Sequence, residues 1–452
     1  MINAFQLRMN GKPGLERFLK ELSSAVFYLI IFLLPWQARY FIYTSYINGS
    51  FWEYGSFSIY AIDVFLFLFF SVTVLILIFS PKTFKILPAP FLMFISSGLI
   101  FLFFNIVLSE YGIALLNSFR FFIALIFFYI AVVIPFSKKT LIWAFVLGAF
   151  ISSIFGVYQF IAQSVFGSTF LGIAEQLPHI SGASVVEYAD GRFIRAYGTL
   201  SHPNALGGFL GLSLFALMYL LITARSSIER ILIYSITFIL SAALVFTFSR
   251  SAMLSFFTVS TLLFYLAAIY KHSFFKQTLF FFLIVVFAIA GTGLLTFPLI
   301  KERFTLNDRL TRESIEERLK DYSLDREASA KDLFIGIGVG SYTAFTSKMD
   351  NFSKSAWAYQ PHHNAYILAF MEIGGIGVFI LALLIFFIIK GVAVYIRNGR
   401  MEDTLPWAPM LIFILITSLF DHFWWSSHFG IIIFYLILAL NLRFVLPLSR
   451  NS

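Results

Sequence analysis

The feature that most constrains this fold is a series of apolar runs, each about as long as a bilayer is thick. A membrane-crossing helix needs about 20 mainly apolar residues, and about twelve such runs are present. We expect helices near residues 22–40, 57–80, 88–108, 112–136, 140–165, 203–224, 229–249, 251–270, 277–299, 362–390, 406–422 and 428–446. The chain is 12% charged, against roughly 25% in soluble domains. The predicted fold is therefore an all-α polytopic membrane protein, with residues 1–452 forming a single integral membrane domain.

The distribution of Lys and Arg predicts the orientation of these spans. Most basic residues fall in one alternate set of short connections, whereas the short connections of the other set hold only Arg39, Arg192 and Arg195. Basic loops stay in the cytoplasm, so both termini should be cytoplasmic. The net charge of +9 is then a signal of topology, and we expect no nucleic-acid partner.

Two outward segments are longer than the others, about 166–202 and 301–361, and the second separates the ninth and tenth spans. Apolar residues spaced for a helix at 315–322, between charged ones, predict a short surface helix within this long extracytoplasmic loop. The sequence LFIGIGVGSY at 333–342 resembles a phosphate-binding loop only superficially, because no Lys-Ser/Thr follows it. A closely packed turn is the better interpretation.

Arginines beside span ends are candidates for binding an anion. Arg250 follows Ser249 at the outer end of the eighth span, where it can serve as a turn residue at the headgroups or contact an anion at a helix N-terminus. Arg195, with Arg192 as the weaker alternative, precedes the Pro203-Asn204 start of the sixth span. For both sites the plain structural interpretation stays open.

The junction QPHHNAYILAFMEIGGIG, residues 360–377, has a polar start and an apolar continuation. A neutral histidine at this position, His362 or His363, is suited to accept a proton near neutral pH. Metal binding is the rival interpretation, but there is no Cys and no HExxH spacing, so we expect no metal. Three charges inside apolar runs should first be structural pairs and second functional groups: Asp63, Arg120 and Glu372.

The spacing at His363 matches a family signature. His363-Asn364 is followed by nine residues and then by Gly374-Gly375-Ile376-Gly377. On this motif the chain resembles the O-antigen ligase and polymerase family, bacterial multi-pass membrane proteins that handle polyprenyl-diphosphate-linked glycans. Three further landmarks follow the family order: Arg195 to Asn204, Ser249-Arg250, and Arg318 ahead of the glycine turn.

The resemblance implies a metal-independent, inverting glycosyltransferase without a cofactor, located in the bacterial inner membrane with an extracytoplasmic active site. A glycan would pass from a polyprenyl-diphosphate donor to a hydroxyl of a lipid or glycan acceptor, as in lipopolysaccharide or polysaccharide biosynthesis. By this resemblance His363 is the catalytic base, and Arg250, Arg195 and Arg318 bind the diphosphate. Supporting roles fall to Asn364, His362, Glu372 and Asn204.

Other functions remain open from the sequence. A polymerase joins one lipid-linked repeat to another by the same chemistry, and transfer to a protein differs only in the acceptor. A lipid-glycan flippase belongs to a different class, in which inverted repeats and midplane sites are common. The marked residues fall instead at one outer face, which favours an enzyme.

Overall fold

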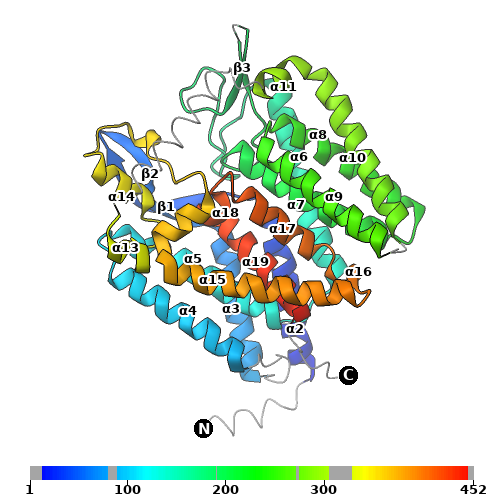
Figure 1. Ribbon diagram of the computed structural model, residues 1–452, viewed down its shortest axis with the longest axis horizontal. Coiled ribbons are helices and arrows are strands. Elements are labelled where there is room, and N and C mark those ends of the chain that lie inside the picture. Colours follow the sequence, from blue (N-terminus) through cyan, green and yellow to red (C-terminus); the bar gives the residue numbers. More distant parts are fainter. Residues whose placement is uncertain (1–12, 80–88, 190, 271–273, 305–327, 446–452) are drawn as a thin grey trace.

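The computed structural model describes residues 13–79, 89–189, 191–270, 274–304 and 328–445. Its long helices pack side by side, and most of the irregular structure gathers at one end, around β1, β2, β3 and α14 (Figure 1). Both predicted long outward segments contribute to that end of the molecule. We call it the loop end, and it comprises residues 34–60, 163–202, 330–364 and 418–427.

A helix lies within or across each predicted apolar run. These helices are α2 (Pro13–Leu33), α3 (Ala61–Phe79), α4 (Ala89–Val107), α5 (Ile113–Val133), α6 (Lys138–Ala162), α7 (Pro203–Ile222), α8 (Ser227–Phe246), α9 (Arg250–Ile269), α10 (Phe275–Leu295), α15 (Ala365–Arg397), α17 (Trp407–Thr417) and α19 (His428–Val445). Within the described ranges, 8 helices are long and apolar enough to cross a membrane. A polytopic membrane protein is therefore supported, while the count of about twelve spans stays a prediction.

The fold is mostly helical, as expected, but the first predicted connection contains a pair of strands. The strands β1 (Arg39–Ile47) and β2 (Ser50–Tyr60) form an antiparallel hairpin, so the first helix ends at Leu33 and the second begins at Ala61. Asn48 and Gly49 form its turn with φ values of 52° and 78°. This dipeptide favours two-residue hairpin turns, because both positions tolerate positive φ. The flanking aromatic residues then pair across the strands.

Further short elements lie at the loop end or beside it. The strands β3 (Val185–Tyr188) and β4 (Gly191–Ile194) form a second small hairpin. The helices are α11 (Phe297–Phe304), α13 (Ala330–Ile335), α14 (Tyr342–Met349), the 3₁₀ turn η3 (Ala356–Ala358) and α18 (Phe423–Ser426). A last short helix, α16 (Met401–Thr404), follows α15. The predicted surface helix near 315–322 lies outside the described residues.

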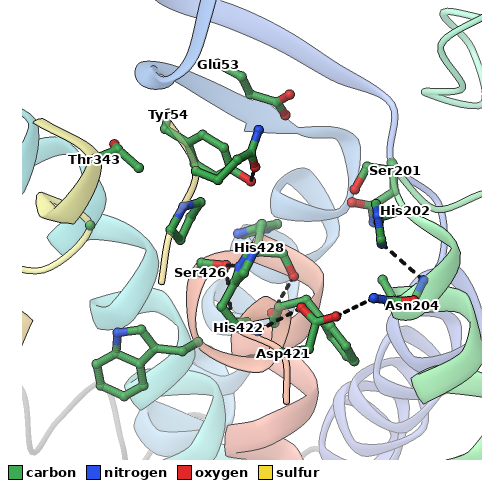
Figure 2. Close-up of a pocket in the computed structure, with 18 of the residues that line it drawn as sticks. Glu53, Tyr54, Ser201, His202, Asn204, Thr343, Asp421, His422, Ser426 and His428 are labelled. Atoms are coloured by element: carbon green, nitrogen blue, oxygen red, sulfur yellow. Dashed lines mark hydrogen bonds between the residues drawn. The ribbon is translucent and has the colours of Figure 1, made fainter. Parts of the chain in front are cut away.

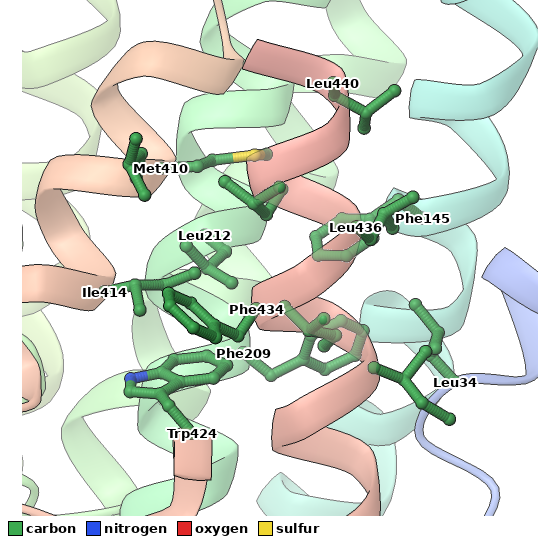
Figure 3. Close-up of a cluster of buried hydrophobic side chains, with 14 of the residues drawn as sticks. Leu34, Phe145, Phe209, Leu212, Met410, Ile414, Trp424, Phe434, Leu436 and Leu440 are labelled. Carbon is green, nitrogen blue, oxygen red and sulfur yellow. The ribbon is translucent and has the colours of Figure 1, made fainter. Parts of the chain in front are cut away.

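The core of the bundle surrounds α7. This helix is apolar on all sides, and nearly all of its residues are buried. That is expected of a helix enclosed by other helices. Phe209 and Leu212 of α7 lie against Ile414 of α17, beside Phe434 and Leu436 of α19 (Figure 3). The start of α7, which carries Asn204, is therefore held on a rigid support.

The helix α15 is kinked at Gly374, where φ is 61° and ψ is 178°. At the kink the carbonyl of Glu372 accepts hydrogen bonds from Gly338 N at 3.1 Å and from Asn105 Nδ2 at 2.9 Å. A Cβ on Gly336 would lie 2.2 Å from that carbonyl oxygen. The prediction of a closely packed glycine turn is thus confirmed, and the turn packs against the kinked helix.

Candidate functional site

A cavity of about 720 Å³ opens at the loop end and collects side chains from six separate parts of the chain. Its walls come from β1 and β2, from α5, from the segment 172–205, from the start of α9, from 340–372 and from 421–431. The polar side chains labelled in Figure 2 converge on it. Five of the predicted site residues line the same cavity, namely Arg195, Asn204, Arg250, His363 and Glu372.

His363 is positioned by the cap of α15. Asn364 is the N-cap residue, and its Oδ1 accepts from Tyr366 N at 2.9 Å and Ile367 N at 3.3 Å. His362 Nδ1 accepts the Asn364 N–H at 3.0 Å, and this ring is only 1% exposed. Asn364 and His362, two of the predicted supporting residues, thus hold the backbone around His363. The His363 residue itself borders the cavity.

Two hydrogen bonds hold the guanidinium of Arg195. Nε donates to the Thr247 carbonyl at 2.7 Å, and an Nη donates to Asn204 Oδ1 at 2.6 Å. The side chain borders the cavity although the residue is only 4% exposed overall. Arg192, the weaker candidate, lies instead in β4 beside Glu187, with an N–O distance of 3.7 Å. The structure therefore brings Arg195, and not Arg192, to the site.

Asn204 connects Arg195 to an acid from the far end of the chain. Its Nδ2 donates to Asp421 Oδ2 at 2.7 Å, and Asp421 Oδ1 accepts the His422 N–H at 2.8 Å. Asp421 is 5% exposed and lies in the connection between α17 and α18. The cap of α15 is tied to the same connection, because Ala365 N donates to the Ser418 carbonyl at 2.9 Å.

Asp421 is surrounded by histidines. The His363 and His422 ring centroids are 5.6 Å apart, and one ligand-type atom from each of His363, Asp421 and His422 lies within 4.8 Å of the others. Burial raises the pKa of the Asp421 carboxyl, but His422, His202 and His363 together hold this pKa below its usual value. Asp421 is therefore an anion at neutral pH and can stabilise a positive charge formed on a neighbouring imidazole.

The other two histidines are in neutral form. Burial in the cavity wall and the charge of Arg195 lower the pKa of His202, and burial lowers the pKa of His422. The ring of His202 borders the cavity and is exposed to it, while protein surrounds it on its other sides. Its Nδ1 accepts the Asn204 N–H at 3.1 Å and its Nε2 lies 3.0 Å from Ser184 Oγ. A neutral ring provides the free lone pair that this first contact requires.

Glu372 lies in the wall of the cavity, at the kink of α15. It is 4% exposed, and its carboxylate accepts from Trp425 Nε1 at 2.8 Å and from Tyr342 N at 3.4 Å. From the sequence we expect Glu372 to be paired first of all. Its partners are the Trp425 indole and the backbone amides of Gly340 and Tyr342, and no ion pair with an Arg joins it within the ranges described.

The remaining candidates lie in different environments. Arg250 is the first residue of α9, behind the N-cap Ser249, and borders the cavity. Arg318 falls outside the described residues, so its placement at the site stays a prediction.

Asp63 forms the expected structural pair, since its Oδ1 lies 2.8 Å from Nε2 of His428 and both side chains are buried. Arg120 has no carboxylate partner in the described part of the chain, contrary to expectation. It lies over the ring of Phe57, 5.2 Å from its centroid, and borders the cavity.

One group of side chains in the part of the chain that the structure describes has metal-ligand chemistry. Two imidazoles and a carboxylate, from His363, His422 and Asp421, match a common zinc donor set. The Asp421 oxygens already accept from Asn204 and from the His422 backbone, and Ser426 Oγ lies 2.6 Å from His422 Nδ1. Four arginines border the same cavity, namely Arg39, Arg120, Arg195 and Arg250, against three carboxylates, those of Glu53, Glu372 and Asp421. These contacts and this charge favour an anion over a cation as the ligand.

The sequence did not single out Asp421, His422 or His202. One signal was available for the first two, because DHFWW at 421–425 places an ionisable pair at the end of an apolar run, where such residues are costly. His202 stands within the segment already marked by Arg195 and Asn204, directly before Pro203. His202 is important because its ring accepts the N–H of Asn204, and Asn204 in turn binds Asp421. The second contact exists only in the folded chain.

A comparison with known families gives a match over part of the chain. The model of a family described as O-Antigen ligase matches residues 235–382, which include Arg250, His363, Gly374 and Gly377. Arg195, Asn204 and Asp421 lie outside the matched residues. No curated protein matches the chain. The family resemblance stated from the His363 motif is thereby confirmed.

Proposed function

We propose that this chain, a member of the O-antigen ligase family by its match over residues 235–382, transfers a glycan from a polyprenyl diphosphate to an acceptor hydroxyl. The observation that carries the proposal is the cavity shared by His363, Arg195 and Arg250, which come from distant segments of the chain. A proton acceptor beside fixed cations is the combination that such a transfer needs.

His363 acts as the base in this mechanism. The acceptor hydroxyl loses its proton to the imidazole as its oxygen attacks the anomeric carbon. The new C–O bond forms on the face opposite the diphosphate, so the anomeric configuration is inverted. Asp421, whose carboxylate lies within 4.8 Å of the His363 ring nitrogen, stabilises the imidazolium that results.

The arginines stabilise the leaving group. As the bond from the anomeric carbon to the diphosphate breaks, negative charge grows on the departing oxygen. Arg195 is suited to receive it, because Thr247 and Asn204 fix its guanidinium before substrate binds. Arg250 adds the charge of its side chain at the N-terminus of α9, where backbone N–H groups also favour an anion. Arg318 is proposed as a third contact from the family resemblance alone.

The orientation follows from the charge pattern. With basic connections in the cytoplasm, the loop end and its cavity face the extracytoplasmic side of the bacterial inner membrane. The donor's lipid tail stays in the bilayer while its headgroup enters the cavity. In this account the reaction uses fixed guanidinium groups where nucleotide-sugar enzymes commonly use a metal ion.

Two acceptors fit this chemistry. A ligase would use a hydroxyl of a lipid or other finished molecule, and a polymerase would use a second lipid-linked repeat. The alternative of a flippase is disfavoured by the position of the candidate residues at one end of the bundle, because transporter sites are common near the midplane.

Product analysis tests this proposal. Purified full-length protein is incubated with a polyprenyl-diphosphate glycan and candidate acceptors, with and without a chelator, and products are identified by mass spectrometry. We expect glycan transfer at a rate that the chelator leaves unchanged, with inverted stereochemistry at the new linkage. Transfer that requires a divalent cation would contradict the arginine-based mechanism and point to His363, Asp421 and His422 as a metal site.

A further inference from the structure

The β1–β2 hairpin forms the cavity wall on the side away from Asp421 and His422. Glu53 and Tyr54 lie on that side in Figure 2, across from the histidines. The wall also includes Arg39, Phe41 and Phe51, while the neighbouring segment contributes Trp357 and Gln360. The hairpin lies outside the residues that the family model matches, so its function must be argued from its own chemistry.

The hairpin is fixed to the segment that leads to His363. At its tip, Asn48 Nδ2 donates to the Phe352 carbonyl at 2.8 Å and to the Lys354 carbonyl at 3.2 Å. Ile47 and Trp52 form a buried cluster with Ala356 and Tyr359. Nearer the cavity, Tyr54 Oη donates to Gln360 Oε1 at 3.1 Å. These contacts hold the wall at a set distance from the proposed base, as recognition of a substrate requires.

The polar groups of this wall are paired and carry no net charge. Arg39 Nη donates to Glu53 Oε1 at 2.8 Å, and the two side chains remain 26% and 50% exposed. A guanidinium, a carboxylate and the Gln360 amide thus present planar donors and acceptors to the cavity. Because the charges of Arg39 and Glu53 offset each other, this wall is a poor site for a diphosphate and a good one for uncharged hydroxyl groups.

Aromatic rings at the cavity rim complete the wall. Phe51 is 43% exposed and Trp357 is 61% exposed, although both border the cavity. Phe51 packs edge-on against Phe41, with ring centroids 5.2 Å apart, and Gln360 Nε2 bonds the Trp357 carbonyl at 2.7 Å. Exposed rings held in this way can stack on the apolar face of a sugar ring while neighbouring polar groups bind its hydroxyls.

We propose that this wall, formed by the β1–β2 hairpin with Trp357 and Gln360, is a saccharide-binding subsite that recognises a pyranose ring of the reacting glycans. The inference rests on the proposed function for the identity of the substrate, and it adds the site at which sugar, as opposed to diphosphate, is selected. The bound ring belongs to the donor glycan or to a glycan acceptor, which present the same hydroxyl chemistry.

Saccharide binding to detergent-purified full-length protein tests the inference without relying on catalysis. The probes are a panel of lipid-free neutral and amino-sugar oligosaccharides, and titration calorimetry gives the Kd. The variants are Trp357→Ala and Glu53→Gln. The matched control is Tyr40→Ala, which changes a 76% exposed ring of the same hairpin that does not border the cavity. Thermal unfolding of each variant checks that the fold is retained.

We expect the two wall variants to weaken saccharide binding roughly three- to tenfold, with the control unchanged. Binding of polyprenyl diphosphate without a glycan should be equal in wild type, Trp357→Ala and Tyr40→Ala. Equal saccharide Kd values in wild type and both wall variants, or a wild type that binds no member of the panel, would overturn the inference.

The transfer assay separates this inference from the proposed function. A wall that binds saccharide in a protein that transfers no glycan would refute the function alone. Transfer with unchanged KM values for donor and acceptor in both wall variants would refute the subsite alone. A raised KM for the donor identifies the donor glycan as the occupant, and a raised KM for the acceptor identifies the acceptor glycan.

Discussion

The side-chain amide of Asn204 donates to Oδ2 of Asp421 over 2.7 Å, although the two residues are 217 positions apart. On its other side the same amide accepts from Arg195 at 2.6 Å. A cation, an amide and an anion therefore form one connected chain, with the His363 ring beside the anion. In the proposed reaction these hydrogen bonds fix Arg195, which receives the negative charge of the leaving group, relative to Asp421, which stabilises protonated His363.

Replacing Arg195 with Lys tests the value of the fixed guanidinium. Lysine keeps the positive charge but cannot bond Thr247 and Asn204 together with the same planar geometry. We expect the transfer rate to fall about 10²-fold, the size of effect seen when one preorganised donor to a developing anion is lost. Initial rates with a lipid-diphosphate donor give the measurement.

The control for that variant is Arg192→Lys. Arg192 belongs to the adjoining β-hairpin, pairs with Glu187 and does not border the cavity. Its transfer rate should equal that of wild type. Equal loss in both variants would mean that the effect comes from the segment's fold instead of the site.

Gly374→Ala should destabilise the protein through the kink of α15. The position has a φ of 61°, and an added Cβ would lie 2.4 Å from the Phe334 carbonyl oxygen. Such strain costs about 1–3 kcal/mol of the free energy of unfolding. Gly375→Ala is the matched control, because its Cβ would meet the Leu333 carbonyl oxygen at an ordinary 3.5 Å and its φ is not in the positive range. Unfolding midpoints in detergent should fall for the first variant only, and equal midpoints would contradict the explanation of this motif glycine.

Acid should destabilise the loop end through His202. Its folded pKa lies below that of the unfolded chain, about 6.5, because burial and Arg195 disfavour the protonated ring. As pH falls below that value the unfolded state binds more protons, so the stability contributed by His202 is progressively lost. The stability contributed by His422 should fall with pH in the same way, since burial lowers the pKa of His422 too.

The variant His202→Asn isolates this contribution. Asparagine can still accept the N–H of Asn204 as a helix cap but does not titrate. The drop in unfolding midpoint between about pH 7 and about pH 5 should be smaller in the variant than in wild type. A drop of the same size in both proteins would show that His202 is not protonated on unfolding.

The positions of the helices could be predicted from the sequence because lipid requires long apolar runs, and each run stands out without reference to its neighbours. The β1–β2 hairpin was missed even though Asn48-Gly49 is a strong hairpin signal. Its aromatic strands adjoin the apolar runs on either side, so hydropathy alone carried the first predicted span to residue 40 and started the second at residue 57.

The site was predictable where one residue carries a local signature and not where it depends on contact. His363 is marked by its spacing to Gly374 and Gly377, and Arg195 and Arg250 by their place at span ends. Asp421 acquires its role only when the end of α17 meets the starts of α15 and α7, with Ala365 bonded to Ser418 and Asn204 bonded to Asp421. No spacing in the sequence expresses that relationship.

The most direct test of the account is glycan transfer by His363→Ala compared with wild type, using one lipid-diphosphate donor and one acceptor. The control His179→Ala removes an exposed histidine that does not border the cavity, and unfolding midpoints confirm the fold of both variants. Loss of a general base predicts a fall of about 10²-fold or more for His363→Ala and none for His179→Ala. A His363→Ala protein that folds normally and transfers glycan at the wild-type rate would contradict the assignment of His363 as the catalytic base.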